Sequence, residues 1–187
     1  MSDFPVHSIE TAPVAARDRL AAAKAAFGFV PNLLGMLAES PTALEAYLGI
    51  GAVFQRSSLS PAEQNVVLLA VSVTNGCHYC VAAHTMIAAG AKVPNAVVEA
   101  IRNGLPIDNP KLEAVRRFAE AVVRERGWAE AALGQFLAAG YTRANALEVL
   151  VGVTQKTLSN YANHLAHTPL DSAFAAKAWS PAGHPAS

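Results

Sequence analysis

Signals that start and stop helices recur along the whole chain, and they constrain the fold more than any other feature. Ser40 and Ser60 are each followed by a proline, the arrangement of an N-cap hydroxyl before a first helical residue. Glycines such as Gly76 and Gly140 end the apolar stretches, because glycine readily adopts the left-handed backbone that closes a helix. Between these signals apolar residues recur at intervals of three and four, and β-branched runs are short, so helices are expected and strands are not.

These signals predict an all-α fold, a helical bundle of about seven to nine helices. At 187 residues the chain is about one domain long. We expect a single domain over residues 1–179, with its core at about 25–172, and a disordered tail at 180–187. The expected helices cover residues 13–28, 41–54, 61–73, 77–90, 94–102, 110–126, 129–139 and 142–167, with a short helical turn after Pro31.

Charged side chains are scarce, which bears on partners. Only 15% of residues are charged, against 52% hydrophobic, and the 14 basic and 14 acidic side chains cancel. A sparsely charged surface favours burial against other copies of the chain, so we expect a homo-oligomer. Nucleic-acid binding has no basic stripe to support it, and no apolar run is long enough for a membrane-spanning helix. The N-terminus, MSDFPVHSIE, lacks the pattern of a secretory signal, so a cytoplasmic location is expected.

An internal echo aligns residues 59–80 with 141–162. Ser60 meets Thr142 and Tyr79 meets Tyr161, while Cys77 meets Ser159. Two related helical hairpins would explain the similarity, with only the first keeping the chemistry. Any two apolar helices can align this well, so chance similarity is an equal alternative.

Cys77, Cys80 and His84 form the strongest chemical motif. On a helix, at about 100° per residue, all three occupy one narrow stripe, and Cys80 and His84 are a contacting i, i+4 pair. A cysteine pair three residues apart in a reducing compartment is more often catalytic or metal-binding than a structural disulfide. A helix N-terminus stabilises a thiolate and a neighbouring histidine can take its proton, so the spacing favours reversible thiol–disulfide chemistry.

Other interpretations compete with the redox one. Two cysteines and a histidine could hold zinc, with His164 or His167 as a fourth ligand, although a structural zinc site needs four ligands and no second cluster is evident. The cysteines could also be small core residues. Glu63 is explained by a capping box with Ser60. Asn160, Asn163 and His164 are expected to cap or hydrogen-bond within the last helix. Neither a metal nor a cofactor is therefore expected.

The segment SPAEQNVVLLAVSVTNGCHYCVAAH resembles the core of the alkylhydroperoxidase D and carboxymuconolactone decarboxylase superfamily. The segments FGFVPNLLGMLAESPTALEAYL and NYANHLAHTPLD are similar to its peroxidase-related branch. This resemblance implies an all-α homo-oligomer that reduces a hydroperoxide with two cysteines and is regenerated by an external dithiol, lipoyl- or thioredoxin-like. It also implies that Cys80 attacks the peroxide, Cys77 resolves the intermediate and His84 belongs to the proton relay.

Two positions depart from the pattern of that family. Asn65 stands where the relay glutamate is expected, and Tyr79 replaces a histidine that here has moved to His78. An amide can orient a water molecule but cannot take a proton near neutral pH. Our hypothesis is that His84 acts with a water held by Asn65.

A non-peroxidase member of the fold is the alternative function. It would be a lactone decarboxylase-like enzyme or an oligomeric binding scaffold. The Cys-x-x-Cys pair argues against it, since that branch does not need two thiols.

Overall fold

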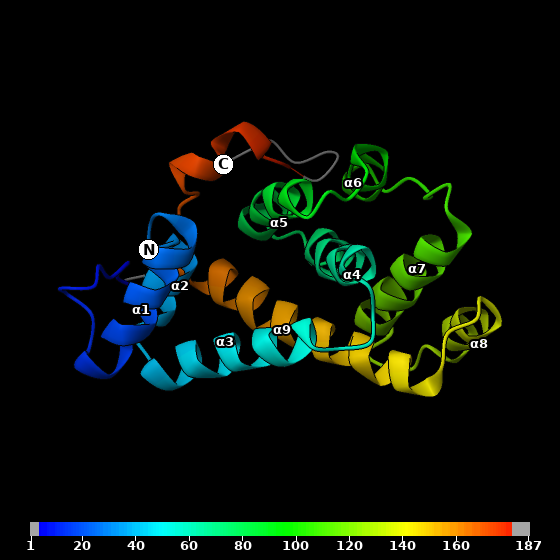
Figure 1. Cartoon of the computed structure of the whole chain (residues 1–187), viewed down its shortest axis with the longest axis horizontal. Helices are drawn as coiled ribbons and strands as arrows, with labels where there is room; N and C mark the ends of the chain where they lie inside the picture. The colour runs from blue at the N-terminus through cyan, green and yellow to red at the C-terminus, as the bar shows by residue number, and fades with distance from the viewer. Residues whose placement is uncertain (1–3, 181–187) are drawn as a thin grey trace.

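The structure is a computed structural model that describes residues 4–180, and in this range it contains helices and no strands. The elements are α1 (Val14–Phe27), α2 (Asn32–Leu37), α3 (Pro41–Gln55), α4 (Pro61–Thr74), α5 (His78–Gly90), α6 (Asn95–Arg102), α7 (Pro110–Arg124), α8 (Glu130–Ala138), α9 (Arg143–Ala166) and the 3-10 helix η1 (Ser172–Lys177). Figure 1 shows their arrangement. The expected all-α fold is confirmed, and each expected helix lies within two residues of its observed bounds. Of the predicted tail, 181–187 lie outside the described residues.

The predicted helix starts form as the sequence indicates. Ser60 accepts a hydrogen bond from the Glu63 amide, and the Glu63 carboxylate accepts one from the Ser60 amide. Thr142 and Asn145 form the same capping box at the start of α9. The echo therefore extends to the caps, but the second hairpin does not exist. Where α4 and α5 are separated by Asn75–Gly76, α9 runs unbroken from Arg143 to Ala166.

Helix α4 is the centre of the bundle (Figure 1). It packs against α5, α6, α7 and α9, and α3 lies along α9. The larger hydrophobic core surrounds α4, with Val67, Val71, Val115 and Val149 each fully buried. Burying apolar surface at about 25 cal/mol per Å² makes this core the main stabilising contribution.

A second, smaller core lies between α1, α2, α5 and η1. It contains Leu20, Leu34 and Phe174 together with both cysteines. Cys77 and Cys80 are therefore placed inside the protein, between the N-terminal helices and the central bundle.

Helix α9 buries a polar face in its second half. Lys156, Ser159 and Asn160 are fully buried, and Asn163 is 5% exposed. One turn before Lys156, Gly152 lets α9 approach α3 closely, because a Cβ at this position would lie 2.7 Å from the Phe54 ring. This close approach places the polar face of α9 inside the protein. The opposite face exposes Leu147 and Leu150 in the first half of the helix and Tyr161 and Leu165 near its end, with the polar Thr154 exposed between them. This reverses the usual distribution, in which a helix buries its apolar side.

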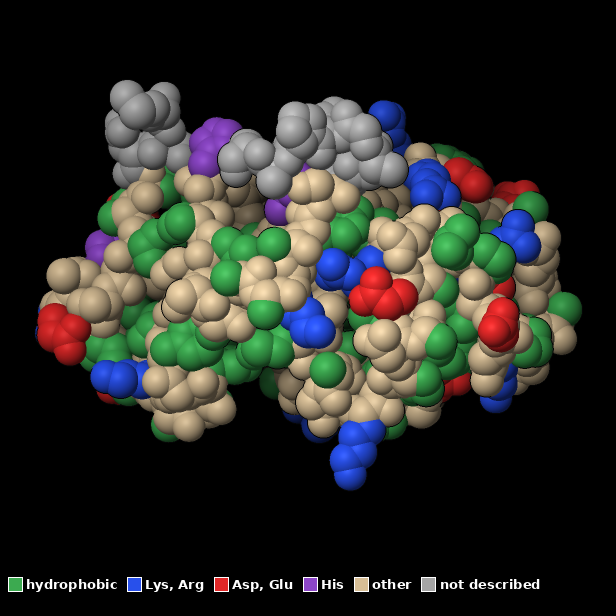
Figure 2. All heavy atoms as spheres, turned by 90° about the horizontal axis from the view of Figure 1, so that it is seen from above, with side chains coloured by type: hydrophobic (Ala, Val, Ile, Leu, Met, Phe, Trp, Pro, Cys, Tyr) green, Lys and Arg blue, Asp and Glu red, His purple; other side chains and the backbone are tan. Residues whose placement is uncertain are grey.

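The surface carries few charges, as the composition predicts. Figure 2 shows hydrophobic and uncharged side chains over much of one face, with charged groups gathered toward its centre and the end that holds α7 and α8. Among the described residues, no helix combines the length and the apolar character needed to cross a membrane.

Candidate active site

The chain turns sharply between α4 and α5 and places Cys77 at the start of α5. Gly76 has a φ of 68°, a left-handed conformation. The Gly76 amide donates to the Val73 carbonyl and the Cys77 amide to the Ser72 carbonyl, the two bonds of a Schellman motif. Cys77 is then itself the N-cap of α5, so the predicted helix starts one residue later, at His78. The turn fixes Cys77 against the first turn that carries Cys80.

Both cysteines are free thiols and each is 1% exposed. Besides the contact between the two sulfurs, their polar contacts come from α9. Asn163 Nδ2 donates to Cys80 Sγ at 3.2 Å and to Cys77 Sγ at 3.7 Å. Cys80 Sγ also lies 3.8 Å from Ser159 Oγ, in a weak hydrogen bond. A hydrogen-bond donor shared by the two sulfurs stabilises negative charge on either one.

A buried lysine completes the cluster. Lys156 on α9 is fully buried, and its Nζ lies 2.8 Å from Nε2 of His84 on α5. Burial and the charge of Lys156 both lower the pKa of His84, so its imidazole is neutral and Nε2 accepts from the ammonium. The Nδ1 atom of His84 is buried and has no hydrogen-bond partner among residues 4–180. His84, predicted to contact Cys80, therefore has Lys156 as its hydrogen-bond partner.

The two thiols differ in acidity. Burial raises the pKa of Cys80, but the hydrogen bond with Cys77, the charge of Lys156 and the Ser159 hydroxyl outweigh it and hold that pKa well below its ordinary value. The hydrogen bond with Cys80, followed by burial, raises the pKa of Cys77. The arrangement thus favours a Cys80 thiolate beside a protonated Cys77 thiol.

A cavity of about 470 Å³ reaches the site. Cys80, His84, Lys156 and Asn65 line it, and Cys77 does not. Three glutamines, Gln55, Gln64 and Gln155, add side-chain amides to the wall. The rest of the wall is mostly apolar and comes from α1–α5, the residue before α2 and η1: Ala26, Phe27, Pro31, Leu33, Leu34, Tyr47, Leu48, Gly51, Ala52, Phe54, Leu68, Tyr79, Ala83, Ile87 and Phe174.

Asn65 lies on α4 and lines this cavity. Its Nδ2 donates to the Pro61 carbonyl at 2.8 Å, and its Oδ1 is buried without a hydrogen-bond partner in the described part of the chain. Glu63 has the capping role predicted for it, and its carboxylate also accepts a hydrogen bond from the Tyr141 hydroxyl.

Sequence reasoning missed the contribution of α9. Asn160 and Asn163 were expected to form hydrogen bonds within their own helix. Instead, Asn163 contacts both cysteines, and Asn160 Oδ1 accepts a hydrogen bond from Asn75 Nδ2 at 3.0 Å. Lys156 and Ser159 were not identified at all. The only signal was the spacing of polar residues at 156, 159, 160 and 163, which share one helical face.

The C-terminal segment holds the far side of the site. The Tyr79 hydroxyl donates to the buried Asp171 carboxylate and accepts from the Leu33 amide. Phe174 of η1 packs edge-on against the Tyr79 ring, with centroids 5.9 Å apart. Tyr79, which replaces the histidine of the resembling family, is therefore a wall of the cavity tied to η1.

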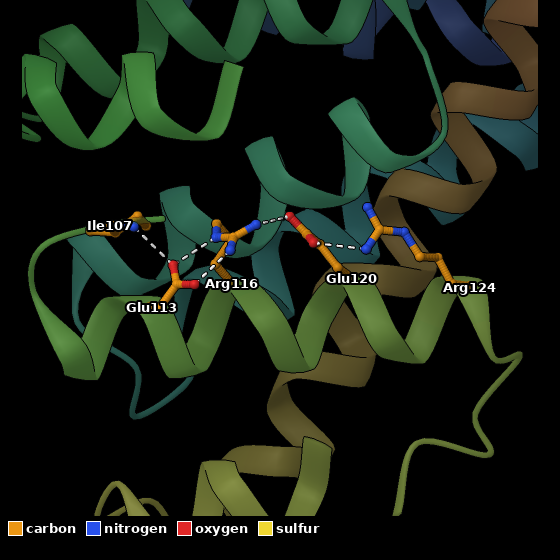
Figure 3. Close-up of polar contacts among 5 residues, drawn as sticks. All are labelled: Ile107, Glu113, Arg116, Glu120 and Arg124. Atoms are coloured by element: carbon orange, nitrogen blue, oxygen red, sulfur yellow. Dashed lines mark hydrogen bonds and ion pairs between the residues drawn. The ribbon is translucent and has the colours of Figure 1, made fainter. Parts of the chain in front are cut away.

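A second polar cluster, on α7, is held together by its own charges (Figure 3). Arg116 pairs with Glu113 at 2.5 Å and with Glu120 at 2.6 Å, and Glu120 also pairs with Arg124 at 3.1 Å. The Glu113 carboxylate accepts from the Ile107 amide as well. These residues pair with one another, so we assign the cluster to stability. Among residues 4–180, no three His, Cys, Asp or Glu side chains are grouped so that they could hold a metal ion.

Comparison with protein families gives one match. Residues 39–121 match the model of the carboxymuconolactone decarboxylase family. This range includes α4, α5 and both cysteines. No curated protein sequence matches the chain significantly.

Several solved structures share the fold. An alkylhydroperoxidase AhpD core, an uncharacterized peroxidase-related protein from Ralstonia eutropha JMP134, is 25% identical with a TM-score of 0.80, covering 91% of this chain and 93% of that chain. A peroxidase-related protein from Silicibacter sp. TM1040 is 18% identical with a TM-score of 0.77, covering 92% of each chain. The debrominase Bmp8, as a cysteine-to-alanine variant in complex with 2,3,4-tribromopyrrole, is 18% identical with a TM-score of 0.80, covering 95% and 96%.

Proposed function

Because the chain belongs to the alkylhydroperoxidase D and carboxymuconolactone decarboxylase superfamily, we propose that it is a thiol-dependent peroxidase that reduces hydroperoxides through Cys80 and Cys77. The single observation that carries the proposal is the unequal placement of the two sulfurs. Cys80 borders the cavity and Cys77 does not. A substrate in the cavity therefore meets Cys80 first, while Cys77 is in position to resolve.

The acidities of the thiols support the same division of roles. The Cys80 thiolate attacks the distal oxygen of the hydroperoxide, the O–O bond breaks, and the leaving alkoxide takes a proton. The resulting sulfenic acid at Cys80 condenses with the Cys77 thiol, which forms the disulfide and releases water. An external dithiol, lipoyl- or thioredoxin-like, then reduces the disulfide by thiol–disulfide exchange.

His84 and Asn65 are proposed to move the proton. With Nε2 accepting from Lys156, the proton of the neutral imidazole is on Nδ1, which makes Nδ1 a donor. Asn65 Oδ1 is an acceptor, and neither atom has a hydrogen-bond partner among the residues that the structure describes, although both residues line the cavity. A water molecule that accepts from Nδ1 and donates to Oδ1 would connect His84 with the reacting oxygen.

The cavity favours organic hydroperoxides. Its apolar wall and its volume of about 470 Å³ suit an alkyl or aryl group better than hydrogen peroxide alone, because burying apolar surface supplies binding energy. We also propose that the protein is a homo-oligomer, since the outer face of α9 exposes large apolar side chains in both of its halves, Leu147 and Leu150 in the first and Tyr161 and Leu165 in the second.

The test combines peroxide turnover with trapping of the intermediate. Cys80→Ser should lose consumption of cumene hydroperoxide, because the nucleophile is gone. Cys77→Ser should react once and stop, leaving a sulfenic acid at Cys80 that dimedone labels and mass spectrometry locates. Label at position 77 in the Cys80→Ser protein, with none at 80 in Cys77→Ser, would contradict the assigned roles.

Reductive debromination is the second candidate, favoured by the apolar cavity beside Cys80 and by the fold shared with the debrominase. Two thiols supply the two electrons that convert a bromoarene into the arene and bromide, with a disulfide as the other product. Bromide release from tribromopyrrole, compared with cumene hydroperoxide consumption by the same preparation, separates the candidates. If Cys77 and Cys80 stay reduced with both tribromopyrrole and cumene hydroperoxide, the protein is a non-redox enzyme or a binding scaffold.

A further inference from the structure

Lys156 is a buried charge that the proposed peroxidase cycle has not yet used. Its side chain is fully buried on the inner face of α9 and lines the cavity beside Cys80. Removing an ammonium group from water is costly unless an opposite charge or hydrogen bonds compensate for it. Its hydrogen bond to His84 Nε2, a neutral acceptor, cannot balance the charge.

The counter-charge must come from the groups that face Lys156. These are Cys80, Cys77 and His84 from α5, and Tyr47 from α3. Burial raises the pKa of Tyr47, and the pKa of Cys77 is raised as well, so both are neutral near pH 7. Burial lowers the pKa of Lys156, but the charges that face the amine, with that of Cys80 the largest, and a hydrogen bond with Cys80 together outweigh it and raise the pKa. The Cys80 thiolate is thus the one anion in this set.

We infer that Lys156 is a catalytic residue, the counter-ion of the Cys80 thiolate and the source of the proton that the leaving alkoxide takes. This inference rests on the proposed function, because it assigns a role within the peroxidase cycle. The path runs from Lys156 Nζ to His84 Nε2, across the 2.8 Å hydrogen bond, while His84 Nδ1 releases its own proton into the cavity.

The cycle balances with this source. Thiolate, ammonium, the Cys77 thiol and one hydroperoxide give the Cys80–Cys77 disulfide, a neutral amine, one alcohol and one water. Two electrons pass from the sulfurs to the O–O bond, and the charges of thiolate and ammonium disappear together. Oxidation therefore leaves no uncompensated charge in the core. Reduction by the external dithiol returns a proton to Lys156 and restores the ion pair.

The role of Lys156 also accounts for Asn65. A glutamate at that position can serve as a base that removes the thiol proton. With a fixed ammonium beside Cys80, the thiol is ionised in the resting protein and no such base is required. An amide that holds a water is then sufficient.

The first experiment measures thiolate absorbance at 240 nm against pH in the reduced protein, with the Cys80→Ser spectrum subtracted. Lys156→Met removes the charge at similar volume, and we expect the midpoint to rise by about two pH units or more. Lys156→Arg keeps the charge and should keep a midpoint below about 7.5. Lys24→Met, at an exposed lysine, is the control. An unchanged midpoint in Lys156→Met would overturn the inference.

A measurement on the native protein covers the case in which Lys156→Met does not fold. Selective 13C labelling of lysine Cε follows each amine by NMR, with Lys156→Arg to assign the resonance. In the reduced protein Lys156 should remain protonated to about pH 10, and after diamide oxidation it should lose its proton at a pH lower by about two units or more. The same titration in both states would contradict the proposal.

Peroxide turnover separates this inference from the proposed function. A large thiolate shift in Lys156→Met, with no peroxide consumption by the native protein, would retain the ion pair and reject the peroxidase. Turnover by the native protein that falls about 100-fold in Lys156→Met supports both. Native turnover that is unchanged in Lys156→Met would retain the peroxidase and reject the catalytic lysine.

Discussion

A few neighbouring side chains set the acidity of Cys80, and this acidity determines how the oxidation rate of the protein depends on pH. The thiolate is the reacting form, and the pKa of Cys80 is held well below its ordinary value despite burial. Lowering the pH protonates Cys80 only when the pH falls through that lowered pKa. An unperturbed thiol would instead lose reactivity from about pH 8.5 downward.

We therefore expect the rate of single-turnover oxidation of the reduced protein to be nearly constant from about pH 8 to pH 6. Stopped-flow fluorescence or quenched thiol titration with cumene hydroperoxide measures it. A decline of about tenfold per pH unit over this range would show that Cys80 is protonated in the resting protein.

Asn65 is the residue at which this site departs from the glutamate of the resembling family. A carboxylate at the same place can exchange protons near neutral pH, which the amide cannot. Because Lys156 already keeps Cys80 ionised, we expect Asn65→Glu to leave peroxide turnover within about twofold of the native rate, and Asn65→Leu, which cannot hold the water, to lower it by about tenfold. A gain of about tenfold in Asn65→Glu would show instead that proton transfer through position 65 limits the rate of the native protein.

The boundaries of the helices could be predicted from the sequence, but the contacts between residues far apart in the chain could not. Serine and threonine caps and glycine stops are local chemistry, so the start of α4 and its end at Gly76 could be predicted from the sequence. The 3-10 helix η1 was missed, since its Tyr79–Asp171 anchor joins residues far apart in the chain. The burial of Lys156 was missed for the same reason, because lysine is almost never fully buried unless paired, and its partners lie on α5.

The stabilising effect of each ion pair on α7 depends on how deeply its side chains are buried (Figure 3). The Arg116 side chain is 10% exposed and pairs with Glu113 and Glu120, whereas the Arg124 side chain is 64% exposed. Arg116→Leu leaves carboxylates of low exposure without their partner and should lower the free energy of unfolding by about 3 kcal/mol. Arg124→Leu, the matched control, should cost less than about 1 kcal/mol.

Urea denaturation followed by circular dichroism gives both values. The effect of Arg116→Leu should shrink on acidification. The hydrogen bonds from Arg116 and the Ile107 amide, together with the charge of Arg116, outweigh burial and lower the pKa of Glu113. The contribution of Glu113 to stability is therefore present above the ordinary carboxyl pKa and is lost as pH falls through the lowered one. Equal costs for the two variants near pH 7 would mean that burial does not strengthen these pairs.

At the scale of the whole molecule, α9 connects the candidate site with the surface. Its inner face carries Lys156 and Asn163 to the cysteines, and its outer face presents Leu147, Leu150 and Leu165 to solvent. A helix of 24 residues that exposes an apolar stripe interrupted only at Thr154 is stabilised by a cover, and 15% charged residues leave little polar surface to solubilise it. A second copy of the chain supplies the same stripe, so two α9 helices can pair about a two-fold axis.

We therefore expect the native protein to elute as a dimer or larger assembly in size-exclusion chromatography with light scattering. Leu147→Glu combined with Leu165→Glu should shift it to monomer, because charge at both ends of the stripe opposes pairing. Val14→Glu, at an apolar side chain on α1 that is 78% exposed, should leave the assembly intact. Leu147 and Leu165 lie on the same helix as Lys156, so loss of the partner at the outer face of α9 should loosen the position of Lys156. The monomer should therefore also turn over peroxide more slowly. An unchanged mass in the double variant would place the subunit interface elsewhere and leave the apolar face of α9 without a function in assembly.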